Sequence, residues 1–325
     1  LRKDLISGKL LQMPGAHEPI VARIIEEQKF DGIYISGGAL SASMAMPDIG
    51  LTTLSEVTQR GRQIARVTNL PALIDLDTGF GEAMNTARTI QECEELGITG
   101  CHIEDQQSPK RCGHLDNKEI IETEAMCQKI SAAINAKRDP NFLIMVRTDA
   151  KSIEGIQAAI ERAKAYVQAG AEAIFPEALE TEKEYELFRK AIDVPLLANM
   201  TEFGKTPLYS KKKLEEFGYN IAIYPVSSLR IAMGAIETSY ATLKKEGSLI
   251  SVVNQMQTRK RLYEVIKYEE YNKFDEKIHN LVENFDCIVI ENYNENIDEK
   301  LLYSFINQIS QFNKILIINS LKNIK

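Results

Sequence analysis

The sequence predicts an α/β protein built as a closed (β/α)8 barrel of the TIM type. Short apolar runs alternate with amphipathic segments, eight such units fill residues 10–245, and polar residues gather where the runs end. Strand–helix alternation is typical of parallel strands joined by right-handed crossovers. Eight units favour a closed barrel, and an open doubly wound sheet is the alternative. Residues 1–247 would form the barrel domain.

The eight expected strands are short runs rich in β-branched and aliphatic residues. They are Leu10–Pro14, Gly32–Ser36, Pro71–Asp77, Gly100–Asp105, Phe142–Asp149, Ala173–Pro176, Pro195–Asn199 and Asn220–Pro225. Between them, apolar residues recur three and four positions apart, as at Ile156, Ile160 and Ala163, which is typical of helices that cover a sheet with one face. The same periodicity predicts a helix over Asn117–Ala136.

Two further regions follow the barrel. We expect a helix over Ser227–Lys245, followed by a break at Gly247-Ser248. Residues 248–283 then form a second helical region, rich in tyrosine and mixed charge. Its apolar face lies beyond the eighth barrel unit, so we expect it to pack on a neighbouring subunit. Residues 284–325 form a tail rich in Asn, Ile and Lys whose role the sequence does not indicate. In this tail we expect a strand over Asp286–Asn292, a helix over Glu299–Phe312 and an apolar run at Ile315–Asn319.

Composition excludes several classes of protein. The 325 residues are 44% hydrophobic, and 39 basic against 46 acidic residues give a formal net charge of −7. An acidic chain without a long basic block is a poor nucleic-acid binder, although a local basic site for a polycarboxylate is compatible with it. Five cysteines without a Cys-x-x-Cys pair indicate reduced thiols and a cytoplasmic location. No apolar run approaches about 18 residues and no leader is evident, so we expect neither a membrane span nor secretion.

The end of the third expected strand carries a candidate metal site. Residues two apart in a strand share a face, so Asp75 and Asp77 would point together into the barrel mouth while Ile74 and Leu76 face the helices. Hard carboxylate oxygens suit Mg²⁺, which keeps several waters, and Glu104 could join through one of them. An Asp-x-Asp pair on a solvated surface is the alternative.

The segment after the fourth expected strand carries a thiol among cations. Cys112 lies beside Lys110, Arg111 and His114, and Gly113 lets the backbone bend. The neighbouring cations should hold carboxylates and favour the thiolate form of the cysteine. A basic surface loop with an idle cysteine is the alternative.

Other polar groups at the strand ends could hold the carboxylates of a substrate. They are the turn Ser36, Gly37 and Gly38, the guanidinium groups of Arg147 and Arg230, and the side chains of Asn199 and Thr201. Exposed backbone N–H groups and guanidinium groups both bind carboxylates. Alternatively, the turn is an ordinary one, the arginines neutralise buried acids and the other two finish a strand's backbone bonding. With a hard metal and a thiol, these groups indicate a multi-carboxylate substrate that passes through an enolate-like state.

At these residues the chain resembles the isocitrate lyase / phosphoenolpyruvate mutase superfamily. The resemblance runs in order from Leu10 to about Glu270. The matching stretches are Tyr34–Gly38, Asp75–Gly81, Pro109–His114, Val146–Ala150, Phe175–Ala178, Leu197–Gly204 and Met256–Arg259.

The resemblance implies an activity and an assembly. It implies an eight-stranded barrel whose terminal helices are swapped between paired subunits of a homotetramer, and Mg²⁺ as cofactor, with Mn²⁺ as a substitute. The implied reaction is a retro-aldol (Claisen-type) cleavage of the small tricarboxylate 2-methylisocitrate into pyruvate and succinate, a step of the methylcitrate cycle in propionate catabolism.

The resemblance also implies roles for individual residues. Asp75, Asp77 and Glu104 would hold the metal, and Ser36, Gly37 and Gly38 would bind the α-oxyacid end of the substrate. Cys112 would protonate the succinate carbanion, with Lys110 and His114 assisting, and Tyr34 would handle the hydroxyl proton. The remaining substrate-site residues would be Gly113, Arg147, Glu177, Asn199, Thr201, Arg230 and, from the terminal region, Arg259.

Other members of the superfamily are less similar to this chain. Isocitrate lyases share the Lys-x-Cys-Gly-His loop but are considerably longer and carry a tryptophan after the seventh strand. Here that region reads Asn199-Met200-Thr201-Glu202 and the chain has no tryptophan, which favours the methyl-bearing substrate. Members that cleave carbon–phosphorus bonds or act on oxaloacetate generally lack the loop cysteine. A barrel that has lost catalysis is disfavoured because candidates for metal, acid and arginine occur together.

Overall fold

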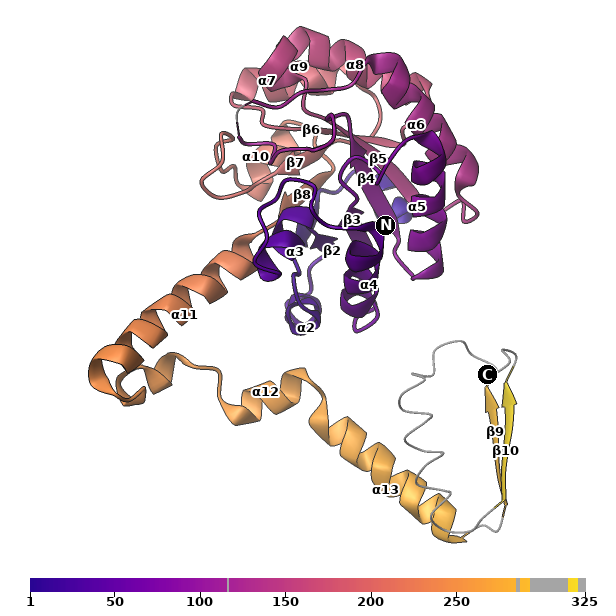
Figure 1. The fold of residues 1–325 in the computed structure, drawn as a ribbon, viewed down its shortest axis with the longest axis vertical. Helices are drawn as coiled ribbons and strands as arrows, with labels where there is room; N and C mark the ends of the chain where they lie inside the picture. Colours follow the sequence, from indigo (N-terminus) through magenta and orange to yellow (C-terminus); the bar gives the residue numbers. More distant parts are fainter. Residues whose placement is uncertain (116, 285–286, 293–314, 321–325) are drawn as a thin grey trace. The chain divides into compact units, whose positions relative to one another are not determined.

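The computed structural model describes residues 1–115, 117–284, 287–292 and 315–320 (Figure 1). The chain divides into two compact units, Leu1–Val253 and Asn254–Lys325. Each unit is described by itself below.

Eight parallel strands form the centre of the first unit (Figure 1). They are β1 Leu11–Pro14, β2 Ile33–Ile35, β3 Ala72–Asp75, β4 Gly100–Glu104, β5 Leu143–Thr148, β6 Ala173–Pro176, β7 Leu197–Asn199 and β8 Ile221–Tyr224. Strands β2 to β6 pair in chain order, and β1 pairs with β8, which pairs with β7. Parallel bridges Gly15–Tyr34 and Ile174–Leu196 join the two sheets at both edges, so the strands close into a ring. The predicted α/β fold with parallel strands is confirmed.

Helices follow the strands on the outside of this ring. They are α2 Pro19–Glu27, α3 Gly37–Ser43, α4 Leu54–Ala65, α5 Ala83–Glu95, α6 Thr123–Ala136, α7 Lys151–Glu154, α8 Ile156–Gln168, α9 Glu182–Ala191 and α10 Lys211–Glu216. Helix α1 Arg2–Ile6 precedes β1, and its Leu5 packs on the apolar cluster inside the ring. Capping boxes start α4 and α9, since Thr53 and Thr181 each exchange hydrogen bonds with the glutamate three residues later.

Helix α6 begins six residues later than predicted. The predicted helix over Asn117–Ala136 is wrong at its start because Ile120 forms an antiparallel bridge with Gln106, which keeps this part of the chain extended. The connection from Glu104 to Thr123 is therefore longer than expected. It contains the segment with Lys110, Arg111, Cys112, Gly113 and His114, which is called the thiol loop below.

The strands separate two apolar clusters, as alternation in a barrel requires. Side chains such as Met13, Leu73 and Met145 fill the inside of the ring. Ile74 and Leu76 belong to the outer cluster, which the strands share with the helices. The predicted orientation of β3 is thus confirmed, and it turns Asp75 toward the ring's interior.

The chain continues after β8 with long helices. Helix α11 Ser227–Glu246 belongs to the first unit and buries none of its residues there. The 3-10 helix η1 Ile250–Gln255 runs across the boundary between the two units. The second unit contains α12 Arg259–Val265 and α13 Tyr268–Asn284. Its strands β9 Cys287–Asn292 and β10 Ile315–Ser320 pair in parallel, at the two predicted apolar runs. The helix predicted over Glu299–Phe312 lies outside the described residues.

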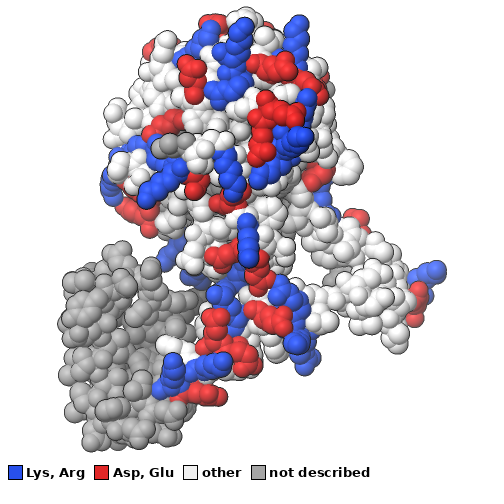
Figure 2. All heavy atoms as spheres, turned by 180° about the vertical axis from the view of Figure 1, so that it is seen from behind, with Lys and Arg blue, Asp and Glu red and all other residues white. Residues whose placement is uncertain are grey.

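Charge is spread evenly over the visible surface of the barrel. Figure 2 shows basic and acidic side chains interspersed there, without a large area of one sign. A continuous basic face would be expected of a nucleic-acid binder. In the part of the chain that is described, none of the helices has the length and apolar character needed to cross a membrane.

Candidate active site

Two carboxylates lie at the C-terminal end of β3, as predicted. Asp75 is fixed by two backbone groups: the N–H of Gly37 donates to its Oδ2 at 3.1 Å and the N–H of Asp77 donates to its Oδ1 at 3.0 Å. A Cβ atom on Gly37 would lie 3.0 Å from Asp75 Oδ2 and 3.1 Å from Asp77 Oδ1, so only glycine fits comfortably. Ser36 caps α3 by accepting from the Ala39 N–H. The predicted Ser-Gly-Gly turn is therefore a helix start packed on the two carboxylates.

Lys110 reaches these carboxylates from the thiol loop. Its Nζ lies 2.9 Å from Asp77 Oδ1 and also contacts Asp48, and the side chain is almost fully buried. Burial would lower the pKa of Lys110, but the carboxylates of Asp77, Glu104 and Asp48 raise it well above its usual value. Burial raises the pKa of Asp77 to about 6, against the opposing effect of the ammonium group. The loop lysine thus remains a cation at the end of β3.

Glu104, at the end of β4, is a buried carboxylate that lacks hydrogen bonds. Its backbone N–H donates to the Asp77 carbonyl at 2.9 Å, which places it beside β3. Neither carboxylate oxygen has a hydrogen-bond partner, and Arg147 Nε lies 3.3 Å from Oε2. Burial raises the pKa of Glu104 well above its usual value. A buried polar group without a partner is uncommon in native proteins, and it indicates a ligand, water or ion in the working state.

Arg147, at the end of β5, pairs with three carboxylates. Its Nε lies 2.9 Å from Asp149 Oδ2, its Nη2 donates to Asp149 Oδ1 at 3.1 Å, and its Nη1 lies 3.1 Å from Glu177 Oε2. Glu104 is the third partner. Although burial opposes it, these carboxylates raise the pKa of Arg147 further. The guanidinium group therefore neutralises buried acids, which was the alternative interpretation, and it lies at the barrel mouth as predicted.

Cys112 is partly buried in the loop above these groups. Burial raises the pKa of its thiol, although a hydrogen bond from the backbone of His114 acts in the opposite direction. The expectation that nearby cations favour the thiolate is wrong. Lys110 is engaged by two aspartates, and the Arg111 guanidinium lies 3.3 Å from the Lys110 carbonyl of its own loop. The thiol therefore keeps its proton, as a general acid requires.

His114 connects the loop to β6 and β7. Its Nε2 lies 3.2 Å from Glu177 Oε1, and its Nδ1 accepts a hydrogen bond from the Lys205 N–H at 3.0 Å. Asn199 Nδ2 donates to both oxygens of Glu177, at 3.3 and 3.4 Å. The backbone donor to Nδ1 requires that the ring carry a proton on Nε2, facing the carboxylate. The loop, the β6 carboxylate and the β7 amide are thus assembled as one cluster.

A protein-family comparison identifies the fold family. The sequence profile described as phosphoenolpyruvate phosphomutase matches residues 1–244. The chain belongs to this family. Solved structures of the same superfamily align closely: 2,3-dimethylmalate lyase has a TM-score of 0.80 at 29% identity, covering 85% of this chain and 93% of its own. Phosphonopyruvate hydrolase, solved with oxalate and Mg²⁺, has a TM-score of 0.77 at 31% identity, covering 84% of this chain and 95% of its own.

Sequence relatives within the family are more similar still. A probable 2-methylisocitrate lyase of Corynebacterium glutamicum is 57% identical over 84% of this chain and 90% of its own length. The 2-methylisocitrate lyases of Bacillus subtilis and Escherichia coli are each 46% identical, over 85% and 86% of this chain and 91% and 94% of their own lengths. The chain is accordingly an enzyme, and its relatives are lyases.

The described residues do not contain a preformed set of metal ligands. Among the described residues, no group of three or more His, Cys, Asp and Glu side chains is arranged to hold an ion by itself. Asp75, Asp77 and Glu104 lie on adjacent strand ends, but they do not form a three-ligand set. Their carboxylates are hard oxygen donors of the kind that Mg²⁺ prefers, and both oxygens of Glu104 lack a hydrogen-bond partner among the described residues.

Tyr34, which the family resemblance places at the site, contacts a histidine to which the sequence analysis assigned no role. The Tyr34 hydroxyl and His102 Nε2 are 2.7 Å apart, and burial lowers the pKa of His102 to about 4. Burial also raises the pKa of Tyr34 well above its usual value, so a protonated phenol shares this hydrogen bond with a neutral ring. Asp48 and Lys118 were missed because neither follows a strand. Both lie in connecting segments, where no periodic pattern indicates which way a side chain points.

Three predicted substrate residues lie outside the cluster of His114, Glu177 and Asn199. Thr201 is buried just after β7. Arg230 is exposed on α11, with its guanidinium carbon 5.2 Å from the centre of the Phe203 ring. Arg259 belongs to the second unit, so its contribution stays a prediction.

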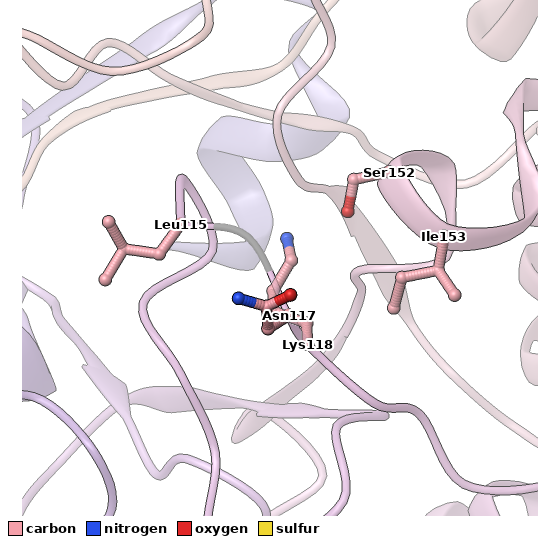
Figure 3. A pocket seen from close by; sticks show the side chains of 5 residues that line it. All are labelled: Leu115, Asn117, Lys118, Ser152 and Ile153. Atoms are coloured by element: carbon pink, nitrogen blue, oxygen red, sulfur yellow. The ribbon is translucent and has the colours of Figure 1, made fainter.

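A pocket of about 290 Å³ lies where the thiol loop meets α7. It is lined by Leu115, Asn117, Lys118, Ser152 and Ile153, and Figure 3 shows Ser152 and Ile153 facing Asn117 and Lys118 across it. The pocket therefore separates the far end of the loop from the segment that follows β5.

We expect Gly113→Ala to displace the thiol loop. A Cβ atom at Gly113 would lie 2.3 Å from Arg147 Nη2 and 2.5 Å from Glu177 Cγ, closer than real Cβ atoms approach their neighbours. Trypsin should therefore cut after Lys110 or Arg111 several-fold faster in the variant. Gly234→Ala is the matched control, because nothing lies within 4 Å of a Cβ at that position. Equal cleavage rates in the two variants would contradict this packing.

Proposed function

We propose that this enzyme cleaves 2-methylisocitrate into pyruvate and succinate. One observation of the geometry carries the proposal: the thiol loop packs directly on Arg147 and Glu177, at the same barrel mouth as the carboxylates of β3. This brings an acid within reach of a site suited to a polycarboxylate. The names of relatives that are 46–57% identical over more than four-fifths of the chain support the same substrate.

Mg²⁺ is the cofactor that we propose for the site, with Mn²⁺ as a substitute. Asp75 and Asp77 would hold the ion, and Glu104, whose oxygens lack hydrogen bonds, would reach it through water. The related phosphonopyruvate hydrolase, solved with oxalate and Mg²⁺, supports this choice. When bound, the ion would supply a Lewis acid for an oxyanion of the substrate.

The residues of the chain would divide the proton chemistry between them. The hydroxyl of the substrate loses its proton, the carbon–carbon bond breaks toward the succinate half, and the carbanion takes a proton from Cys112 Sγ. The raised pKa of Cys112 keeps that proton in place until it is needed. Tyr34, bonded to a neutral His102, would handle the hydroxyl proton. Gly37, Gly38, Asn199, Thr201, Arg230 and Arg259 would complete the binding of the carboxylates.

A direct assay tests the reaction. Release of the 2-oxo acid should be measured at equal substrate concentrations: pyruvate from 2-methylisocitrate and from 2,3-dimethylmalate, and glyoxylate from isocitrate. We expect the highest kcat/KM with 2-methylisocitrate. A higher kcat/KM with either of the other acids would reassign the substrate within the family. No release from any of them would contradict the proposed function.

We also propose that the enzyme is a cytoplasmic homotetramer whose terminal helices are exchanged between subunits. Helix α11 supports this proposal, since it buries none of its residues and exposes Ile231, Met233, Ile236 and Tyr240. Monomeric soluble proteins rarely expose a contiguous apolar patch of that kind. Light scattering coupled to size-exclusion chromatography measures the mass directly, and a monomer in dilute solution would contradict the proposal.

The tail after Glu283 should be dispensable for this function. The family profile matches residues 1–244, and the stretches that resemble the superfamily end before the tail. A chain that ends at Glu283 should keep kcat, KM and the melting temperature of the full chain, because truncation is tolerated where the backbone leaves a packed domain. An insoluble or monomeric product would show that the tail is structural.

A further inference from the structure

Lys118 makes a buried connection between the thiol loop and the barrel. Its Nζ donates to the Gly113 carbonyl and lies 2.8 Å from Asp149 Oδ1. The exposed fractions of the Lys118 and Asp149 side chains are 1% and 0%. A buried ammonium group is stable only when it is paired and hydrogen-bonded, and this one has both kinds of partner.

Asp149 is itself held firmly at the end of β5. Its carboxylate receives two hydrogen bonds from Arg147, and its backbone N–H donates to Asp105 Oδ1 at 2.9 Å. Asp105 in turn accepts from Thr148 Oγ1 at 2.7 Å and from the Tyr166 hydroxyl at 2.9 Å. Lys118 therefore ties a loop carbonyl to a carboxylate that cannot easily move.

These contacts form a closed circuit around the tip of the loop. From the Gly113 carbonyl it passes through Lys118 and Asp149 to Arg147 (Figure 3 shows Lys118 beside α7). From Arg147 it continues to Glu177 and returns to the loop at His114, the residue next to Gly113. Two adjacent loop residues are thus fixed from opposite sides, by an ammonium group and by a carboxylate. Cys112 immediately precedes them.

We propose that Lys118 is a positioning residue that sets the place of the Cys112 thiol by tying the Gly113 carbonyl to Asp149. This inference rests on the proposed function, in which the thiol acts on a bound substrate. The Lys118 ammonium group has three N–H donors, and two of them bind the Gly113 carbonyl and the Asp149 carboxylate. Lys118 therefore acts through the backbone of the loop. Without it, Gly113 would lose the contact that draws the backbone against Arg147, and the loop would sample positions in which Sγ is too far away to deliver a proton.

The test is Lys118→Met, which keeps an unbranched side chain only one atom shorter and removes the ammonium group. We expect kcat on 2-methylisocitrate to fall about tenfold to a hundredfold with little change in KM, because misplacing a reacting group by about 1 Å has effects of this size. Iodoacetamide should alkylate Cys112 about tenfold faster, measured by mass spectrometry of its peptide, because a loop that opens more often exposes its thiol more often.

Two further variants make the result specific. Lys137→Met removes another lysine that pairs with a carboxylate, Glu172, and it should leave both kcat and Cys112 alkylation unchanged. Lys118→Gln keeps an N–H donor without the charge and should give values between wild type and Lys118→Met. If circular dichroism shows that Lys118→Met does not fold, the comparison of Lys118→Gln with wild type decides.

The outcomes separate this inference from the proposed function. Wild-type kcat and alkylation rate in a folded Lys118 variant would overturn the positioning role. Faster alkylation without a loss of kcat would also overturn it, since the place of the thiol would then not matter to turnover. If the wild-type enzyme releases no pyruvate, the proposed function fails, and the alkylation rates alone still show whether Lys118 anchors the loop.

Discussion

Cys112→Ser should lower kcat about 10²–10⁴-fold, the range over which a positioned general acid usually contributes. Serine preserves the size and hydrogen bonding of the side chain, but its hydroxyl is a far weaker acid than a thiol. KM should change much less, because the carboxylate-binding groups on the strand ends remain in place. The measurement is steady-state pyruvate release for wild type and variant over a range of 2-methylisocitrate concentrations.

Three other cysteines provide the controls for this prediction. Cys93 and Cys101 are buried in the barrel wall, and Cys127 is half-buried on α6. Serine at any of these three positions should leave turnover near the wild-type value, after correction for folded protein. Equal losses in the controls, or substantial activity in Cys112→Ser, would mean that the thiol is structural and that another group supplies the proton.

The strands could be predicted from the sequence because a strand that is buried on both faces appears as a short run of apolar residues. Each expected strand contains the observed one, and only the ends differ. Alternation also fixed which side of β3 faces inward, so Asp75 and Ile74 were correctly assigned to opposite faces. The ends of the expected strands thus indicate the positions of Arg147 and Asn199 from the sequence alone.

Connecting segments were harder to predict, for a physical reason. The direction of a loop side chain depends on contacts with residues far away in sequence, such as Lys110 with Asp48 or Lys118 with Asp149. Sequence proximity suggested that Lys110 and Arg111 act on the neighbouring thiol. In the structure, carboxylates and backbone carbonyls engage these cations, so burial has the larger effect on the pKa of Cys112. The start of α6 was misplaced because a single bridge to Gln106 overrides helical periodicity.

Loss of the proposed metal should have an effect as large as loss of the thiol. Asp75→Asn keeps an acceptor oxygen for one of the two N–H groups of Gly37 and Asp77, so the fold should survive better than in Asp75→Ala, which leaves both donors without a partner. The amide is a much poorer ligand for Mg²⁺ than a carboxylate. Losing several kcal/mol of oxyanion stabilisation corresponds to a fall in kcat of about 10²–10³-fold.

The metal can be followed independently of activity by titrating the apoenzyme with Mn²⁺ and recording the electron paramagnetic resonance of the free ion. Wild type should bind one ion per chain, and Asp75→Asn should bind it much more weakly. Asp193→Ala, at an exposed carboxylate on the barrel surface, is the matched control and should behave as wild type.

Because Lys110 pairs with Asp77 in the structure, ion binding has to compete with this ammonium group. Lys110→Met should therefore bind Mn²⁺ more tightly, even if its turnover falls. Full turnover by EDTA-treated wild-type enzyme, or unchanged Mn²⁺ binding by Asp75→Asn, would show that these carboxylates do not hold a catalytic metal.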